Sequence, residues 1–268
     1  ISSRFPQFPE MIIVGIPSMS NLQRRRDLIP QKTTQYPNGG NADNFIQFFE
    51  KELFNFIDLK YRTTSYKTLV GHSFAGLFSA YYFTQYPNRF QGIHCYASGY
   101  FEEIFTFLND FSSFLQSSDT LTTFLSAGVG LGERPAIVNS NLSFERILIE
   151  NSVPGLKWKF TKYDSAHTHL SFVHEAIYDG LRNQFSDYAI NRDFMMNASY
   201  ENIVNKFSIQ ANKLGTKHPY NEFILMELAE HFAFALDKKD EAIRLLKFNL
   251  EQYPNSEGSK ELLKAIGK

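Results

Sequence analysis

Short apolar runs alternate with amphipathic stretches along residues 11–185 of the chain. Continuous apolar runs are typical of strands buried on both faces of a parallel sheet, and they predict strands at 11–16, 67–70, 90–97, 121–127 and 156–163. Apolar residues at helical spacing predict helices at 44–57 (capped by Asp43 or Asn44), 78–85, 102–115, 142–150 and 173–185. Strands that alternate with helices over short connections predict an α/β fold with right-handed crossovers and a mainly parallel sheet.

The pattern changes near residue 188. Two helices are predicted at Asn221–Leu236 and Lys238–Gln252, and a third at Ser259–Ile266 is expected to cap them. A tetratricopeptide-like unit has small residues, large apolar residues and a closing proline at the positions held here by Ala229, Ala242, Leu246 and Pro254. We therefore expect an α/β domain over 1–188 and a helical, tetratricopeptide-like tail over 189–268.

A single helical unit of this kind cannot bury its own apolar faces. Both predicted tail helices carry many large apolar side chains. We expect the tail to dock on the α/β domain or on a second copy of the chain, as a homodimer. The alternatives are a peptide-binding arm and a helical hairpin without a binding role.

The second predicted strand leads into Gly71-His72-Ser73-Phe74-Ala75-Gly76, which precedes a helix. A serine between small residues at a strand–turn–helix junction is typical of a nucleophile elbow. Gly71 leaves room for a tight turn, in which Ser73 is expected to adopt strained dihedrals. Ala75 stands where such elbows usually have their second glycine. His72 is expected to turn away from Ser73 and to serve packing.

Candidate acids and bases follow later strands. Glu133 follows the fourth predicted strand, and Asp164, His167 and His169 follow the fifth. Because reactive groups gather at the carboxyl ends of parallel strands, these side chains are expected near Ser73. A serine hydroxyl needs a base, and an acid must hold that base in the right tautomer. Glu133 is the predicted acid with Asp164 as the alternative, and His169 is the predicted base with His167 as the alternative.

Composition narrows the classes of partner and cofactor. The formal net charge is −1, so the chain has no overall field for nucleic acid or an anionic membrane. Arg24-Arg25-Arg26 is too short a cluster to change this. Cys95 is the only cysteine, which excludes an intrachain disulfide and a cysteine-built zinc site. No apolar run reaches the length of a membrane span.

Several ordered motifs resemble the putative-esterase family of α/β-hydrolases, which includes enterobactin-esterase-like enzymes. They span roughly residues 5 to 188 and comprise Gly71–Leu77, Met11–Pro17 with Arg24–Pro30, Gly39–Thr63, and His169-Leu170-Ser171 with Ile177–Leu181. The resemblance implies an α/β-hydrolase domain that lacks its first strands here. It also implies that His169, in an H-x-S pattern, is the base rather than His167.

The implied activity is hydrolysis of carboxylic esters through an acyl-enzyme, on siderophore-like or short acyl esters. Ser73 is the expected nucleophile, the Phe74 amide the expected oxyanion donor, and Glu133 (or Asp164, or no acid) the partner of His169. No metal or organic cofactor is expected. The alternatives are an acyltransferase with the same residues and a non-catalytic interaction protein that uses the helical tail. The resemblance favours a periplasmic or secreted location over a cytoplasmic one.

Overall fold

The computed structural model describes residues 7–100 and 106–267. The chain forms two compact units. One is Ile13–Gln184, and the other combines Ile1–Ile12 with Phe185–Lys268. Each unit is described by itself below.

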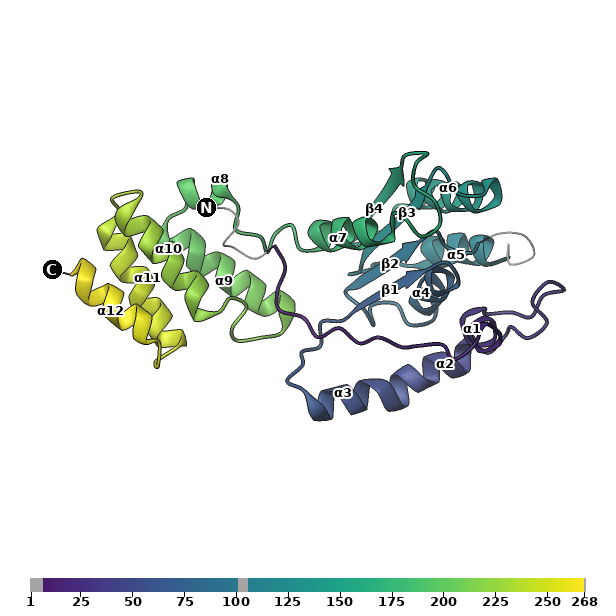
Figure 1. Cartoon of the computed structure of the whole chain (residues 1–268), viewed down its shortest axis with the longest axis horizontal. Helices are drawn as coiled ribbons and strands as arrows, with labels where there is room; N and C mark the ends of the chain where they lie inside the picture. Colours follow the sequence, from purple (N-terminus) through teal and green to yellow (C-terminus); the bar gives the residue numbers. More distant parts are fainter. Residues whose placement is uncertain (1–6, 101–105, 268) are drawn as a thin grey trace. The chain divides into compact units, whose positions relative to one another are not determined.

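The first unit is built on a four-stranded sheet among the residues described (Figure 1). The strands lie in the order β1 (Thr68–His72), β2 (Gly92–Tyr96), β3 (Phe124–Gly130) and β4 (Lys157–Tyr163). All three neighbouring pairs are parallel. The predicted parallel α/β sheet is therefore confirmed, and the carboxyl ends of all four strands meet at one edge.

The predicted strand at 11–16 is wrong. The segment forms no strand, and Ile13 is 92% exposed. An apolar run becomes a strand only where a neighbouring backbone offers hydrogen-bond partners. Met11–Ile16 pairs with none of the four described strands, so hydrophobicity alone misled the assignment.

Most predicted helices of this unit are confirmed, with shifted ends. The helices are α1 (Asn21–Leu28), α2 (Ala42–Phe48), the π-helix η1 (Phe49–Leu53), α3 (Phe54–Lys60), α4 (Phe74–Gln85), α5 (Thr106–Ser117), α6 (Pro135–Glu150) and α7 (Val173–Gln184). Helix α1 lies in a stretch for which no helix was predicted. The start of the predicted 102–115 helix lies outside the described residues. Asn41, rather than Asp43 or Asn44, precedes α2. Helix α6 starts earlier than expected because proline suits the first helical position.

The helices cover the sheet in two layers. Helices α4, α5 and α6 contact one another in sequence, as expected when successive right-handed crossovers advance in one direction. Helix α7 packs on β2, β3 and β4 (Figure 1). Phe49 of η1 packs on α4. The centre of its ring lies 5.8 Å from that of Phe78 and 5.6 Å from that of Tyr82.

A buried polar network ties α7 to the sheet. The Nε2 atom of His94 lies 2.7 Å from Oε1 of Gln184, and its Nδ1 lies 3.2 Å from the Tyr96 hydroxyl. Gln184 also donates to the hydroxyl of Thr68 over 2.8 Å. A Cβ at Gly180 would lie 2.0 Å from the Tyr96 hydroxyl, so only glycine lets α7 approach this closely. The hydrogen bonds satisfy a neutral His94, with the proton on Nε2.

The second unit is helical. It contains α8 (Arg192–Asn197), α9 (Tyr200–Leu214), α10 (Glu222–Phe234), α11 (Lys239–Gln252) and α12 (Glu257–Ile266). The last three confirm the predicted tail helices, whereas α8 and α9 were not expected. Asn249 of α11 is buried and donates to the Glu222 carbonyl and to Ser259, which ties the last three helices together.

Helix α9 covers part of the apolar surface that was expected to need the α/β domain or a second copy. The ring of its Phe207 lies 5.2 Å from that of Phe248 on α11. Ala229 and Ala242, the small residues at the α10–α11 contact, are fully buried. The helical pair thus packs within its own unit, and its likeness to a tetratricopeptide unit stays a prediction.

The buried imidazole of His94 predicts a loss of stability in acid. Burial lowers the pKa of His94 from 6.5 to about 4. The unfolded chain therefore binds more protons than the folded one between these values, so stability should fall as the pH drops through this window. Up to about 3 kcal/mol of unfolding free energy should be lost by pH 4, at ~1.4 kcal/mol per pKa unit.

Urea unfolding from pH 7 to pH 4 measures this loss. The His94→Gln variant keeps a donor towards Gln184 but does not titrate, so its stability should change less over the same range. Parallel curves for the two proteins would contradict the assignment.

Candidate active site

Ser73 sits at the sharp turn between β1 and α4. Its backbone has φ 61° and ψ −123°, a region that residues other than glycine rarely adopt. A Cβ at Gly71 would lie 2.0 Å from the Ala75 carbonyl oxygen, so the turn needs glycine two residues before the serine. The predicted strained serine and the predicted role of Gly71 both match this geometry.

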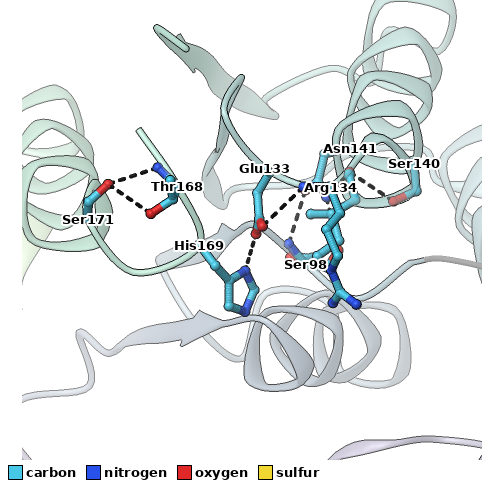
Figure 2. Close-up of polar contacts among 9 residues, drawn as sticks. Ser98, Glu133, Arg134, Ser140, Asn141, Thr168, His169 and Ser171 are labelled. Carbon is cyan, nitrogen blue, oxygen red and sulfur yellow. Dashed lines mark hydrogen bonds and ion pairs between the residues drawn. The ribbon is translucent and has the colours of Figure 1, made fainter. Parts of the chain in front are cut away.

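The segment after β2 holds the turn in place. Ser73 donates its amide to the Tyr96 carbonyl over 2.9 Å, and Gly99 donates to the Ser73 carbonyl over 3.1 Å. Asn141 of α6 in turn clamps Ser98, accepting from its amide over 3.1 Å and donating to its carbonyl over 2.9 Å (Figure 2). Asn141 is fully buried. Sequence reasoning missed it because nothing local distinguishes a buried amide on a helix from an exposed one.

Gly76, one place after Ala75, makes a second tight contact of the elbow, with the end of β2 and the segment that follows it. A Cβ on Gly76 would lie 2.3 Å from the Ser98 hydroxyl oxygen and 3.2 Å from the Tyr96 carbonyl oxygen. The glycine that appeared displaced by one position thus occupies the tight contact, and the alanine before it is accommodated.

Glu133 and His169 form a hydrogen-bonded pair. The Nδ1 atom of His169 bonds to Oε2 of Glu133 (Figure 2). The Glu133 side chain is 5% exposed and that of His169 is 34% exposed, so the acid is enclosed while the imidazole reaches solvent. With Nδ1 directed at the carboxylate, the other ring nitrogen is left to face a reacting group.

Two glycines allow this pair to form. The loop after β3 and the loop after β4 run backbone against backbone, and Gly132 donates to the His167 carbonyl over 3.0 Å. A Cβ on Gly130 would lie 2.3 Å from the His167 carbonyl oxygen, and one on Gly132 would lie 2.4 Å from that of Ser165. The glycine-rich loop therefore brings Glu133 beside the loop that carries His169.

Asp164, the alternative acid, pairs with the other histidine. Its Oδ1 lies 2.7 Å from Nδ1 of His167, and this hydrogen bond raises the pKa of His167. His167 Nε2 also lies 3.3 Å from Glu175. The structure thus brings Glu133 to His169 and Asp164 to His167. Ser171, the last residue of the H-x-S pattern, accepts the Thr168 amide over 2.8 Å and so shapes this loop.

His169 lies against the nucleophile elbow. Its ring centroid is 4.4 Å from that of His72, the residue directly before Ser73. The expectation that His72 only packs is therefore incomplete, because its ring contacts the candidate base. Strand alternation predicts which face a residue takes, but not which distant loop covers that face.

A cation and two aromatic rings also lie at the elbow. The Arg24 guanidinium is 5.2 Å from the centre of the Phe74 ring, which meets the Tyr36 ring edge to face at 5.2 Å. Burial lowers the pKa of Arg24. Arg24 was considered in the sequence as part of a short basic cluster and of a family-like motif, and neither pattern predicted its contact with the elbow.

Neither a metal site nor a membrane helix is found where the structure is described. In residues 7–100 and 106–267, no three His, Cys, Asp or Glu side chains are grouped so that they could hold a metal ion. Within the same ranges, every helix is too short or too polar to cross a bilayer.

Comparisons place this chain among hydrolase folds. The sequence model of the putative esterase family matches residues 4–118. The structure of an IroE-like serine hydrolase from Shewanella oneidensis is 25% identical, with a TM-score of 0.75 over 90% of this chain and 80% of that one. An uncharacterised protein from Capnocytophaga ochracea is 16% identical, with a TM-score of 0.61 over 98% of this chain and 78% of that one.

A third structure, the siderophore hydrolase EstB from Aspergillus nidulans, is 18% identical with a TM-score of 0.51 over 65% of this chain and 67% of that one. No curated protein matches the sequence. The family match and the fold confirm the resemblance to the putative-esterase family of α/β-hydrolases that the motifs indicated.

The loop packing around Glu133 generates a prediction. Gly132→Ala should force the two loops apart and lower the unfolding free energy by about 1–3 kcal/mol, the usual effect of overpacking. Hydrogen exchange of residues 164–171 should become faster as well. Gly15→Ala is the matched control, since nothing lies within 4 Å of a Cβ there. Equal stability and exchange in the two variants would contradict the proposed role of Gly132.

Proposed function

We propose that this protein is a serine hydrolase of carboxylic esters, in which Ser73 is the nucleophile and His169 the general base. The observation that carries the proposal is the enclosed Glu133–His169 pair lying against the elbow of Ser73. The putative-esterase family match and the similarity to an IroE-like serine hydrolase support it.

The acylation half-reaction uses the elbow and the pair together. The Ser73 hydroxyl oxygen attacks the ester carbonyl carbon, and its proton passes to Nε2 of His169. The imidazolium that forms is stabilised by the Glu133 carboxylate at Nδ1. When the tetrahedral intermediate collapses, the bond to the leaving alcohol breaks and His169 returns the proton to that oxygen. The acyl group remains on Ser73.

Negative charge develops on the carbonyl oxygen during this attack. Phe74 is the first residue of α4, so its amide lies at the positive end of a helix directly after the nucleophile. A donor in this position is typically worth about 3 kcal/mol of transition-state stabilisation. We assign the Phe74 amide as an oxyanion donor on this basis.

Deacylation repeats the chemistry with water. His169 takes a proton from water, whose oxygen attacks the acyl carbon, and the proton then goes to the Ser73 oxygen as the acyl–serine bond breaks. The products of this half-reaction are a carboxylic acid and the free enzyme, and no cofactor takes part.

A fluorophosphonate probe tests the assignment of the nucleophile. The wild-type protein should become covalently labelled at Ser73, and Ser73→Ala should not. A panel of synthetic esters, from short acyl chains to a catecholate lactone of the siderophore type, then defines the substrate class. Absence of labelling in the wild type would overturn the proposed function.

The choice of base gives a second test. His169→Ala should lower turnover by about 10⁴-fold or more, because base and nucleophile act as one unit. His167→Ala is the control, since His167 bonds to Asp164 and Glu175 instead of Glu133. Steady-state hydrolysis of the best ester measures both variants. The opposite pattern would assign the base to His167.

The acid is tested in the same assay. Glu133→Gln replaces an acceptor for the Nδ1 proton by an amide that can stabilise the wrong tautomer. Turnover should fall by at least about tenfold, and by up to ~10⁴-fold. Asp164→Asn should have little effect on turnover. A small effect of Glu133→Gln would indicate a serine–histidine dyad.

A further inference from the structure

Helix α6 buries an asparagine in a stripe of side chains that is otherwise apolar. The residues of this stripe recur at helical spacing and are each at most 2% exposed: Ile137, Asn141, Phe144 and Leu148. An apolar side chain in the place of Asn141 would pack there without the cost of removing an amide from water. The asparagine therefore points to a role besides packing.

The side-chain amide of Asn141 is hydrogen-bonded to main chain through both of its polar atoms. Its Oδ1 accepts from the Ser98 amide over 3.1 Å, and its Nδ2 donates to the Ser98 carbonyl over 2.9 Å (Figure 2). Nδ2 also donates to the Ile137 carbonyl, one turn earlier in α6, over 2.9 Å. Both donors of the amide are used. Asn141 thus binds the two main-chain polar groups of a residue outside its own helix.

Ser98 follows a strained residue at the end of β2. Ala97 has φ 41°, a region that residues other than glycine rarely adopt. Such a conformation persists only where the surrounding structure holds it from several sides. The Ala97 amide donates to the Gly128 carbonyl over 2.8 Å, and Asn141 then binds the amide and the carbonyl of Ser98. Asn141 therefore supports the strained turn on the side of Ser98.

The next residue carries this support to the nucleophile. Gly99 donates to the Ser73 carbonyl over 3.1 Å, and Ser73 donates its amide to the Tyr96 carbonyl over 2.9 Å. Ser73 is itself strained, with φ 61°. The strained residues Ala97 and Ser73 thus lie in two turns that are hydrogen-bonded to each other. A displacement of Ser98 would reach the main chain of Ser73 through Gly99 alone.

Helix α6 also begins next to the proposed acid. Arg134 is its N-cap, Glu133 directly precedes that residue, and Asn141 lies in the second turn of the helix. An apolar contact accompanies the polar one, since the rings of Tyr100 and Phe144 stack with their centres 4.8 Å apart. The segment after β2 is therefore fixed to the helix that follows Glu133.

We infer that Asn141 is a positioning residue, which holds Ser98 so that Gly99 supports the Ser73 carbonyl and which fixes this support to the helix that starts after Glu133. The effect on turnover rests on the proposed function. The effect on the main chain does not, because these hydrogen bonds are present without substrate.

Two substitutions separate the hydrogen bonds from the packing. Asn141→Leu keeps the branched outline of the side chain and removes all three hydrogen bonds. Asn141→Asp keeps the acceptor for the Ser98 amide and, because burial keeps the acid protonated, one donor for the Ser98 carbonyl. If Asn141→Leu fails to fold, Asn141→Ala removes the same bonds with a smaller side chain.

Two other asparagines provide matched controls. Asn139→Leu makes the same change at an exposed position of α6. Asn249→Leu makes it at a buried position of α11, where the amide binds Glu222 and Ser259 in the helical unit. The second control reports what the loss of a buried asparagine does to stability by itself. Melting temperatures are measured first, so that all variants are compared in the folded state.

The first readout is hydrogen–deuterium exchange without substrate, resolved at the single amides of Ser73 and Gly99. Neither amide contacts Asn141, so each reports a transmitted effect. We expect both to exchange faster in Asn141→Leu (or Asn141→Ala), less so in Asn141→Asp, and as in the wild type in the two controls. Faster exchange at Ser98 alone, or no change at any of these amides, would overturn the inference, whether or not the protein hydrolyses esters.

The second readout is hydrolysis of the best ester. Asn141→Leu should lower kcat by about ten- to a hundredfold with little change in KM, the range expected when a catalytic group is misplaced by about 1 Å. Asn141→Asp should recover part of this loss, and both controls should keep the wild-type kcat. A loss confined to KM, or an equal loss of kcat in Asn249→Leu, would overturn the positioning role. An inactive wild-type protein would instead refute the proposed function and leave the exchange result to judge Asn141.

Discussion

The positive φ of Ser73 is the constraint on which the candidate site depends. Holding a serine in this conformation costs about 1–3 kcal/mol. The surrounding backbone offsets it through hydrogen bonds from Ser73 to Tyr96, from Gly99 to Ser73 and from Leu77 to Ser73. Because these partners belong to α4, the end of β2 and the segment that follows β2, the elbow requires both the pairing of β1 with β2 and the packing of α4 on them.

The same principle governs the acid–base pair. Glu133 and His169 belong to loops after different strands, and neither loop has a regular structure that would hold its side chain. Close backbone contact, permitted by Gly130 and Gly132, replaces that regular structure. The site is thus assembled from three close contacts, at Gly71, at Gly76 and between the two loops. A Cβ at any of these glycines would meet an atom at less than 3 Å.

Buried polar groups stabilise the frame on which these loops stand. His94, Tyr96 and Gln184 satisfy one another between α7 and the sheet, and Asn141 satisfies the backbone at Ser98. A buried polar group that loses its partner costs about 1–3 kcal/mol. These networks therefore restrict the position of the helices on the sheet, because any shift would break their hydrogen bonds. Apolar contacts alone would tolerate such shifts more easily.

The sequence by itself determined the class of fold and the chemical types at the site. Apolar runs and helical spacing were sufficient for β1 to β4 and for most helices, because these patterns reflect burial that every α/β fold imposes. The elbow was evident at Ser73 because its glycine and its small neighbours are local in sequence. The same reasoning failed at Met11–Ile16, where the pattern could not show whether a neighbouring strand was available.

Tertiary structure decided which groups meet. Position after the strands left Asp164 and His167 open as alternatives to Glu133 and His169, and the packing of two loops pairs each acid with one histidine. The roles of His72, Asn141 and Arg24 likewise depend on contacts between residues far apart in the chain. The sequence pattern predicts whether a residue is buried and in which element it lies. Which residues it contacts depends on how closely distant backbone segments pack in the folded chain.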